Sequence, residues 1–143
     1  MTDAVSGLNV LIVDDDDVAA EAVVRSLNKA GLAFPVTWAE DGEQGLRALR
    51  GEDPSRRVER PRVTLLDLNM PRMDGFEFLQ HLRADPARSD DVVFVLTTSD
   101  AETDRLRAYQ AHVAGYMLKS AVGPQFARLA QLLGDYQRAV RLP

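Results

Sequence analysis

Acidic, hydroxyl and amine side chains stand where apolar runs of this sequence stop. The run "LNVLIV" is followed by "DDDD" (14–17), and the run "VTLL" is followed by Asp67. Two further runs, "VVFVLT" and "GYMLK", end at Thr97 and Lys119. Carboxylates that gather in one place repel one another unless a cation lies among them. Oxygen ligands without His or Cys are those that Mg²⁺ prefers, so these residues predict a magnesium site.

A magnesium ion held by few carboxylates keeps positions open for water and phosphate oxygens, as phosphoryl transfer requires. Asp67 is the candidate nucleophile, because a residue that ends a central strand is fixed in direction yet open to solvent on its loop side. Lys119 and the Thr97 hydroxyl are expected to hold two phosphoryl oxygens. Backbone amides near Asn69 are expected to meet the third.

Each of these residues also has an ordinary explanation. A run of four Asp is usually a solvated loop or a helix start, and Asp17 is expected to cap a helix that begins at Val18. A lone Lys119 is more often a surface charge than a ligand. Only the combination of Asp14, Asp15 and Asp67 with a hydroxyl and a lysine favours a site.

The apolar runs themselves predict how these side chains are positioned. Segments 8–13, 63–67 and 92–97 are nearly continuous in apolar residues, which is typical of strands buried on both faces of a parallel sheet. Segments 34–39 and 115–119 are weaker strands, and Pro35 within the first of them suits a sheet edge.

Segments with helical spacing lie between and after these strands. They cover residues 18–30, 42–49, 76–82, 103–111 and 125–142. The last is expected to bury one stripe, made of Phe126, Leu129, Leu133, Tyr136 and Val140. Five alternating units predict an α/β fold with a doubly wound, five-stranded parallel sheet, in which ligands bind beyond the carboxyl ends of the strands.

Composition limits the classes of function. A chain of 143 residues with 45% hydrophobic and 27% charged residues predicts one globular domain over 1–143, without a second, output domain. The net charge of −5 argues against a broad electrostatic hold on nucleic acid or anionic lipid. No Cys is present and no apolar run approaches the ~20 residues that span a bilayer, so a cytoplasmic, non-membrane protein is expected.

One connection, "GEDPSRRVERPR" (51–62), is long and carries four Arg. We expect an exposed loop, since connecting segments generally lie on the surface. The alternative is a docking surface for an acidic or phosphorylated partner. Replacement of all four Arg with Ser is expected to leave partner binding intact if the loop is simply solvated.

Four motifs resemble those of one family, the receiver domains of bacterial two-component response regulators. They are "VLIVDDDD", "LLDLNMPRMDGFEFL", "VVFVLTTS" and "AGYMLKS". The resemblance implies a flavodoxin-like (βα)5 fold with strand order 2-1-3-4-5. It also implies that Asp67 is phosphorylated from a histidine kinase and that Tyr116 is a rotating aromatic. The implied magnesium ligands are Asp14, Asp15, Asp67 and the Asn69 carbonyl, and the implied phosphoryl contacts are Lys119 and Thr97.

Segments 51–62, 96–104 and 132–143 further resemble a stand-alone subgroup of receivers that includes the partners of bacterial phytochrome kinases. The implied partner is a sensor histidine kinase, such as a bacterial phytochrome, or a phosphotransfer protein. A homodimer through the fourth helix, fifth strand and fifth helix is also implied, with output by protein–protein interaction.

Two residues depart from the family pattern. Ser120 replaces the usual Pro after the lysine, so we expect a trans Lys119–Ser120 peptide, which puts the reach of Lys119 in question. His112 replaces the usual Gly after the fourth helix, where the chain turns with positive φ.

Two other functions are weighed against a phosphorylation switch. A metal-dependent phosphohydrolase commonly needs a second acid two residues after its nucleophile, and Asn69 occupies that position. A receiver that is never phosphorylated and serves only as an interaction module is the other alternative.

Overall fold

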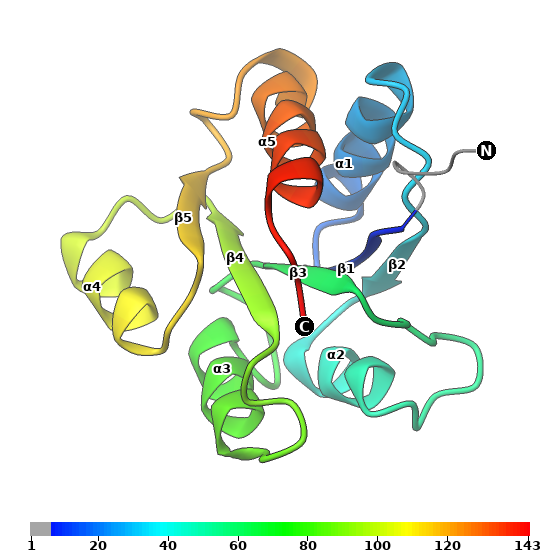
Figure 1. Ribbon diagram of the computed structural model, residues 1–143. Coiled ribbons are helices and arrows are strands. Elements are labelled where there is room, and N and C mark those ends of the chain that lie inside the picture. The colour runs from blue at the N-terminus through cyan, green and yellow to red at the C-terminus, as the bar shows by residue number, and fades with distance from the viewer. Residues whose placement is uncertain (1–6) are drawn as a thin grey trace.

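The three strongest apolar runs form the centre of a parallel sheet in the computed structural model, which describes residues 7–143 (Figure 1). The strand order is β2-β1-β3-β4-β5, as the family resemblance implied. The central strands are buried because helices cover both faces of the sheet, and the two weaker runs lie at its edges. The strands are β1 (Asn9–Val13), β2 (Val36–Ala39), β3 (Arg62–Leu66), β4 (Val92–Thr97) and β5 (Gly115–Leu118).

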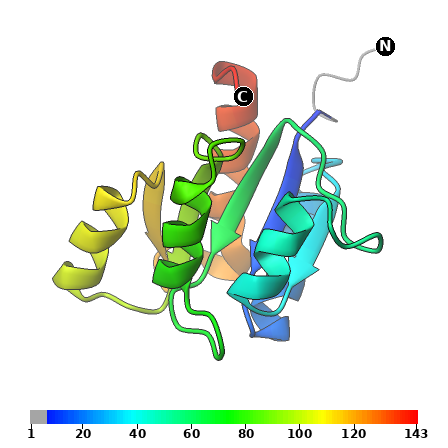
Figure 2. The same cartoon turned by 90° about the horizontal axis from the view of Figure 1, so that it is seen from below.

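Helices form a layer on each face of the sheet (Figures 1 and 2). They are α1 (Asp17–Lys29), α2 (Gly42–Leu49), α3 (Gly75–Ala84), α4 (Glu102–Gln110) and α5 (Ala127–Ala139), the last preceded by a short 3₁₀ helix, η1 (Pro124–Phe126). Val23 of α1 and Leu129 of α5 belong to one hydrophobic core. Leu46 of α2, Phe78 of α3 and Ala108 of α4 belong to the other. The predicted doubly wound α/β fold is confirmed.

Aspartates fix where three of the helices begin. The carboxylate of Asp16 accepts the Val18 amide at 3.0 Å and caps α1. The predicted cap, Asp17, is therefore wrong by one residue and lies in the first turn. Asp41 caps α2, and Asp74 forms a capping box with Glu77 at the start of α3.

The last helix is shorter than its sequence pattern. Leu129 and Leu133 are fully buried, as predicted. Phe126 instead precedes α5 with φ of 58°, and Val140 follows it with 38% of its surface exposed. Phe126 and Tyr136 are partly buried and pack against the core, so only Val140 departs from the predicted stripe.

The connection before β3 is mostly exposed, but its arginines are not simply solvated. Arg62 lies in β3 and is buried, with a bidentate ion pair to Asp91 at 2.8 Å for both hydrogen bonds. Arg56 donates to the Trp38 carbonyl at 3.0 Å, and Arg60 donates to the Ala87 carbonyl at 3.2 Å. The expectation of an exposed loop over 51–62 is therefore wrong for Arg62, whose charge is buried at the start of β3.

The two departures from the family pattern are resolved by the backbone. His112 has φ of 64°, so it takes the left-handed conformation in place of glycine. The peptide between Lys119 and Ser120 is trans. Within residues 7–143, no helix has the length and apolar character that crossing a membrane requires.

Candidate functional site

Three carboxylates meet at the carboxyl edge of the sheet. Asp14 and Asp15 follow β1, Asp67 follows β3, and one oxygen of each lies within 4.8 Å of the others. The two strands are neighbours, and the Asp67 amide donates to the Val13 carbonyl at 2.9 Å. Asp14 and Asp67 are only 2% and 7% exposed, whereas Asp15 faces solvent. The predicted convergence of these acids is present.

Lys119 reaches into this cluster despite the trans peptide that follows it. Its Nζ lies 2.8 Å from Asp14 Oδ2 and 3.7 Å from Asp67 Oδ2. The Lys119 amide donates to the Thr97 carbonyl at 2.9 Å, so the end of β4 positions the lysine. The question raised by Ser120 is therefore answered, because the lysine contacts the acids without proline after it.

The charges of the cluster are unbalanced. Burial raises the pKa of Asp14, and the neighbouring Asp67 adds to this, although hydrogen bonds from Lys119 and the Asp16 amide oppose it. Burial alone would lower the pKa of Lys119, but the carboxylates of Asp14 and Asp67 raise it. One ammonium group among three carboxylates leaves negative charge uncompensated, so the cluster can hold a metal ion.

Thr97 and Tyr116 both contact Ser99. Thr97 is fully buried, and its Oγ1 accepts the Ser99 amide at 3.3 Å. The Tyr116 hydroxyl donates to the Ser99 carbonyl at 2.9 Å. Sequence reasoning singled out Thr97 and Tyr116 but missed Ser99, the last residue of the motif "VVFVLTTS".

The loop after Asp67 is tightly folded against the strand end. A Cβ on Gly75 would lie 2.5 Å from the Asp67 carbonyl oxygen and 2.7 Å from Leu68 Cα, so only glycine fits there. The Leu68 amide donates to Asp67 Oδ1 at 2.8 Å. Asn69 is exposed in this loop, two residues after Asp67.

An ion pair that the sequence did not predict holds the far part of this loop. Arg72, with φ of 65°, donates through Nε to Asp41 Oδ2 at 2.8 Å, and its second nitrogen lies 2.7 Å from the same oxygen. Asp41 could have been recognised as a helix cap, but its partner is 31 residues away in the chain. The ion pair ties the loop that carries Asp67 to the start of α2.

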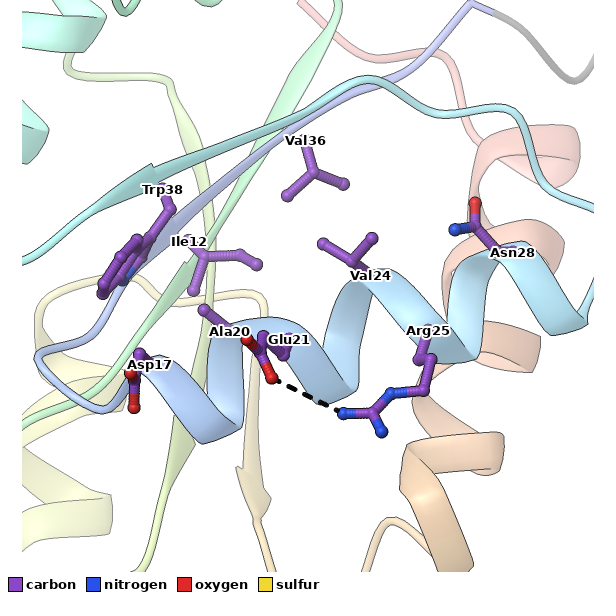
Figure 3. A pocket seen from close by; sticks show the side chains of 9 residues that line it. All are labelled: Ile12, Asp17, Ala20, Glu21, Val24, Arg25, Asn28, Val36 and Trp38. Carbon is purple, nitrogen blue, oxygen red and sulfur yellow. Dashed lines mark ion pairs between the residues drawn. The ribbon is translucent and has the colours of Figure 1, made fainter.

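One groove on the surface is separate from the acids. About 550 Å³ of space lies between α1 and the edge strand β2, over Ile12, Val36 and Trp38 (Figure 3). The ion pair of Glu21 and Arg25, at 3.8 Å, borders it. The Trp38 indole links it to the cluster, because it donates to the Asp14 carbonyl at 2.7 Å.

Known proteins resemble this chain over most of its length. A family model described as the response regulator receiver domain matches residues 10–131. The probable methanogenesis regulatory protein FilR2 of Methanothrix harundinacea is 32% identical over 127 residues, which cover 89% of this chain and 81% of that protein. Response regulator Rcp1 of Synechocystis is 32% identical over 111 residues, which cover 78% of this chain and 76% of that protein.

Solved structures show the same fold. The phosphorylated cyanobacterial phytochrome response regulator RcpA matches with a TM-score of 0.82 and 29% identity, over 94% of this chain and 97% of its own. The Mn²⁺-bound form of Rcp1 matches with a TM-score of 0.81 and 29% identity, over 94% and 98%. The bacteriophytochrome response regulator AtBRR matches with a TM-score of 0.73 and 28% identity, over 94% of both chains. With its acidic cluster at the carboxyl edge of a 2-1-3-4-5 sheet, this chain belongs to the response regulator receiver domain family.

Proposed function

We propose that Asp67 is the phosphoacceptor of this phosphorylation-activated switch, and that Mg²⁺ held by Asp14, Asp15, Asp67 and the Asn69 carbonyl supports the transfer. The observation that carries the proposal is the meeting of three carboxylate oxygens within 4.8 Å beside a single lysine. Mg²⁺ bound there would offset the charge of the incoming phosphoryl group.

The transfer exchanges one bond to phosphorus for another. The bond between phosphorus and an imidazole nitrogen of the kinase histidine breaks, and its electron pair stays on that nitrogen. A bond forms between phosphorus and a carboxylate oxygen of Asp67, which becomes an acyl phosphate. The Leu68 amide, 2.8 Å from Oδ1, orients the carboxylate for this attack.

Lys119 and Thr97 receive the phosphoryl group. Lys119 already lies 3.7 Å from Asp67 Oδ2, so it can exchange its bond to Asp14 for a charge-assisted bond to a phosphoryl oxygen. The Thr97 hydroxyl donates to a second oxygen and moves toward it. This movement gives Tyr116 space to turn and shifts the population of two states of the α4 and β5 surface.

We further propose that the phosphodonor is a sensor histidine kinase, and that a bacterial phytochrome is the favoured kind. Support comes from the resemblance to RcpA and AtBRR, whose names place them with phytochromes. A phosphotransfer protein would offer the same phosphohistidine.

A homodimer through α4, β5 and α5 is proposed as one form of output. Leu106 and Tyr109 of α4 and Leu132 of α5 are large apolar side chains that face solvent. Sedimentation velocity before and after phosphorylation tests this: a larger dimer fraction after phosphorylation supports it, and an unchanged monomer contradicts it.

Incubation with acetyl phosphate separates the switch from its two alternatives. With Mg²⁺ we expect one phosphoryl group per chain, which decays slowly, and with EDTA we expect none. Sustained release of phosphate over many turnovers would instead indicate a phosphohydrolase. Absence of labelling with Mg²⁺ would indicate an interaction module that is not phosphorylated.

A further inference from the structure

We propose that the Ser99 side chain is a positioning residue that couples Thr97 to helix α4. The proposal rests on the phosphorylation switch described above and names the contact through which the buried hydroxyl moves the helix. Within the described residues, Ser99 makes no hydrogen bond to Asp14, Asp15, Asp67 or Lys119.

Ser99 contacts three parts of the switch with three different groups. Its amide donates to Thr97 Oγ1 at 3.3 Å, and its carbonyl accepts the Tyr116 hydroxyl at 2.9 Å. Its hydroxyl donates to Asp104 Oδ2 in the first turn of α4 at 2.6 Å, and it accepts the Ala101 amide at 3.4 Å. The backbone of Ser99 therefore contacts Thr97 and Tyr116, and only its side chain contacts α4.

The start of α4 has little else to hold it. Its N-cap, Ala101, makes no side-chain cap bond, whereas Asp16, Asp41 and Asp74 cap α1, α2 and α3. Ala108 is the buried residue of α4, and it lies near the far end. A helix that buries so little apolar surface depends on polar contacts for its position.

The end of α4 is held differently. The Arg83 guanidinium of α3 donates to the carbonyls of Ala111 and His112 at 2.9 and 3.0 Å. The third nitrogen of Arg83 donates to the carbonyls of Ser89 and Asp91, which fixes the guanidinium to the turn before β4. The carboxyl end of α4 is therefore anchored away from Thr97, and its amino end is tied to Thr97 through Ser99.

These contacts hold the carboxyl end of α4 in place and allow its amino end to move with Thr97. When Thr97 Oγ1 moves toward a phosphoryl oxygen, the Ser99 amide follows its acceptor. The Ser99 hydroxyl then carries Asp104 and the first turn of α4 with it, while Arg83 keeps the last turn in place. The expected motion is a tilt of α4 about its carboxyl end.

The first test needs no phosphorylation. Ser99→Ala removes the hydroxyl and keeps both backbone contacts, so amides of residues 105–107 should exchange with solvent about fivefold faster, as for a lost helix cap. Amides of Ala111 and His112 should be unaffected. Thr98→Ala is the matched control, since Thr98 is an exposed neighbour whose side chain makes no hydrogen bond within residues 7–143. Unchanged exchange at 105–107 in Ser99→Ala would overturn the proposal.

The second test follows the switch itself, with beryllofluoride and Mg²⁺ as the phosphoryl mimic. In the wild type and in Thr98→Ala, NMR signals from the Tyr116 ring and from the α4 amides should both shift. In Ser99→Ala the Tyr116 shift should remain and the shift at residues 102–107 should fall at least about threefold, because only the side-chain link is lost. Ser99→Thr, which keeps a hydroxyl, should restore the shift at residues 102–107.

Asp104→Ala removes the other partner and guards against a folding defect specific to Ser99. If the two side chains act through one bond, the double variant should lose no more of the α4 shift than either single variant. Additive losses, or a full α4 shift in Ser99→Ala, would contradict the coupling. A wild type that shows no shift with the mimic would instead contradict the phosphorylation switch, so the two failures are distinguishable.

Discussion

The central strands carry buried charged groups at both ends. These groups are fully paired at the amino end and only partly paired at the carboxyl end. At the amino end of β3, Arg62 and Asp91 form a bidentate pair, and the remaining Arg62 nitrogen donates to the carbonyls of Leu49 and Val58 at 3.2 and 2.8 Å. At the carboxyl end, Asp14 and Asp67 share one lysine. The charged groups at the amino end are therefore already paired, whereas carboxylate oxygens at the carboxyl end remain available to bind a ligand.

Buried charge alone therefore does not identify the site. An excess of carboxylates over cations does. A saturated pair such as Arg62 and Asp91 has no donor or acceptor left for a ligand, so its role is to hold the connections around it. A cluster with more carboxylates than cations gains by binding a cation. The arginine-rich connection looks solvated in the sequence, yet Arg62 is buried in a paired contact with Asp91. The uncompensated charge lies instead with the acids at the other end.

The largest expected effect is at the unbalanced end. Asp67→Asn should abolish labelling by acetyl phosphate, because an amide oxygen is too weak a nucleophile for phosphorus. Phosphoryl content per chain, measured by intact-mass spectrometry, checks this. Asp17→Asn, an exposed acid outside the cluster, should label like the wild type, and equal labelling of Asp67→Asn would remove the proposed distinction between the two ends.

Removing one partner of the balanced end should cost stability and leave the chemistry in place. Arg62→Ala leaves Asp91 buried without its bidentate partner, so the free energy of unfolding should fall by about 3–5 kcal/mol. Arg57→Ala, an exposed arginine of the same connection, should change it by less than about 0.5 kcal/mol. Urea denaturation measures both. Similar values for the two variants would mean that burial of Arg62 has no energetic consequence.

Two glycines sharpen the comparison at a smaller scale. Gly75→Ala places a methyl group against the Asp67 and Leu68 backbone, so it should destabilise the fold by roughly 1–3 kcal/mol and reduce labelling. Gly134→Ala in α5 meets Leu32 at an ordinary 3.4 Å, and it should stabilise the helix by about 0.5–1 kcal/mol. Thermal unfolding compares them, and a tolerated Gly75→Ala would contradict the tight loop.

The smallest effect is a pH dependence at Asp41. Burial alone would raise the pKa of this carboxyl, but the Gln44 amide and Arg72 bring it below its usual value. The folded state then favours the ionised form, so this contribution to stability is complete above the ordinary aspartate pKa of about 3.9 and is lost as pH falls through the lower, folded value. Asp41→Asn, which keeps the helix cap, should flatten the acid side of the curve of unfolding midpoint against pH. An unchanged slope would contradict the Arg72 contribution.

The sequence predicted the features that depend on local pattern. Continuous apolar runs identified the central strands, and the residues that end them identified Asp14, Asp67, Thr97 and Lys119, because parallel strands must bring their carboxyl ends to one edge. The strand order came only through the resemblance to a family.

The missed features depend on contacts that no local pattern carries. Arg62 was assigned to a solvated connection because its partner, Asp91, is 29 residues away. The ion pair of Arg72 was not predicted because its partner, Asp41, lies 31 residues before it in the chain. Ser99 lies inside a quoted motif, but its contacts with Asp104 and Tyr116 appear only when α4 and β5 are placed beside it.

The most direct test of the acidic edge is to find which residue carries the phosphoryl group. Borohydride reduces an acyl phosphate of aspartate to homoserine, which peptide mass spectrometry locates in the chain. After treatment with acetyl phosphate and Mg²⁺, we expect homoserine at position 67 and at no other acid, and none when EDTA replaces Mg²⁺. Homoserine at a different aspartate, or at position 67 without a divalent cation, would contradict the account.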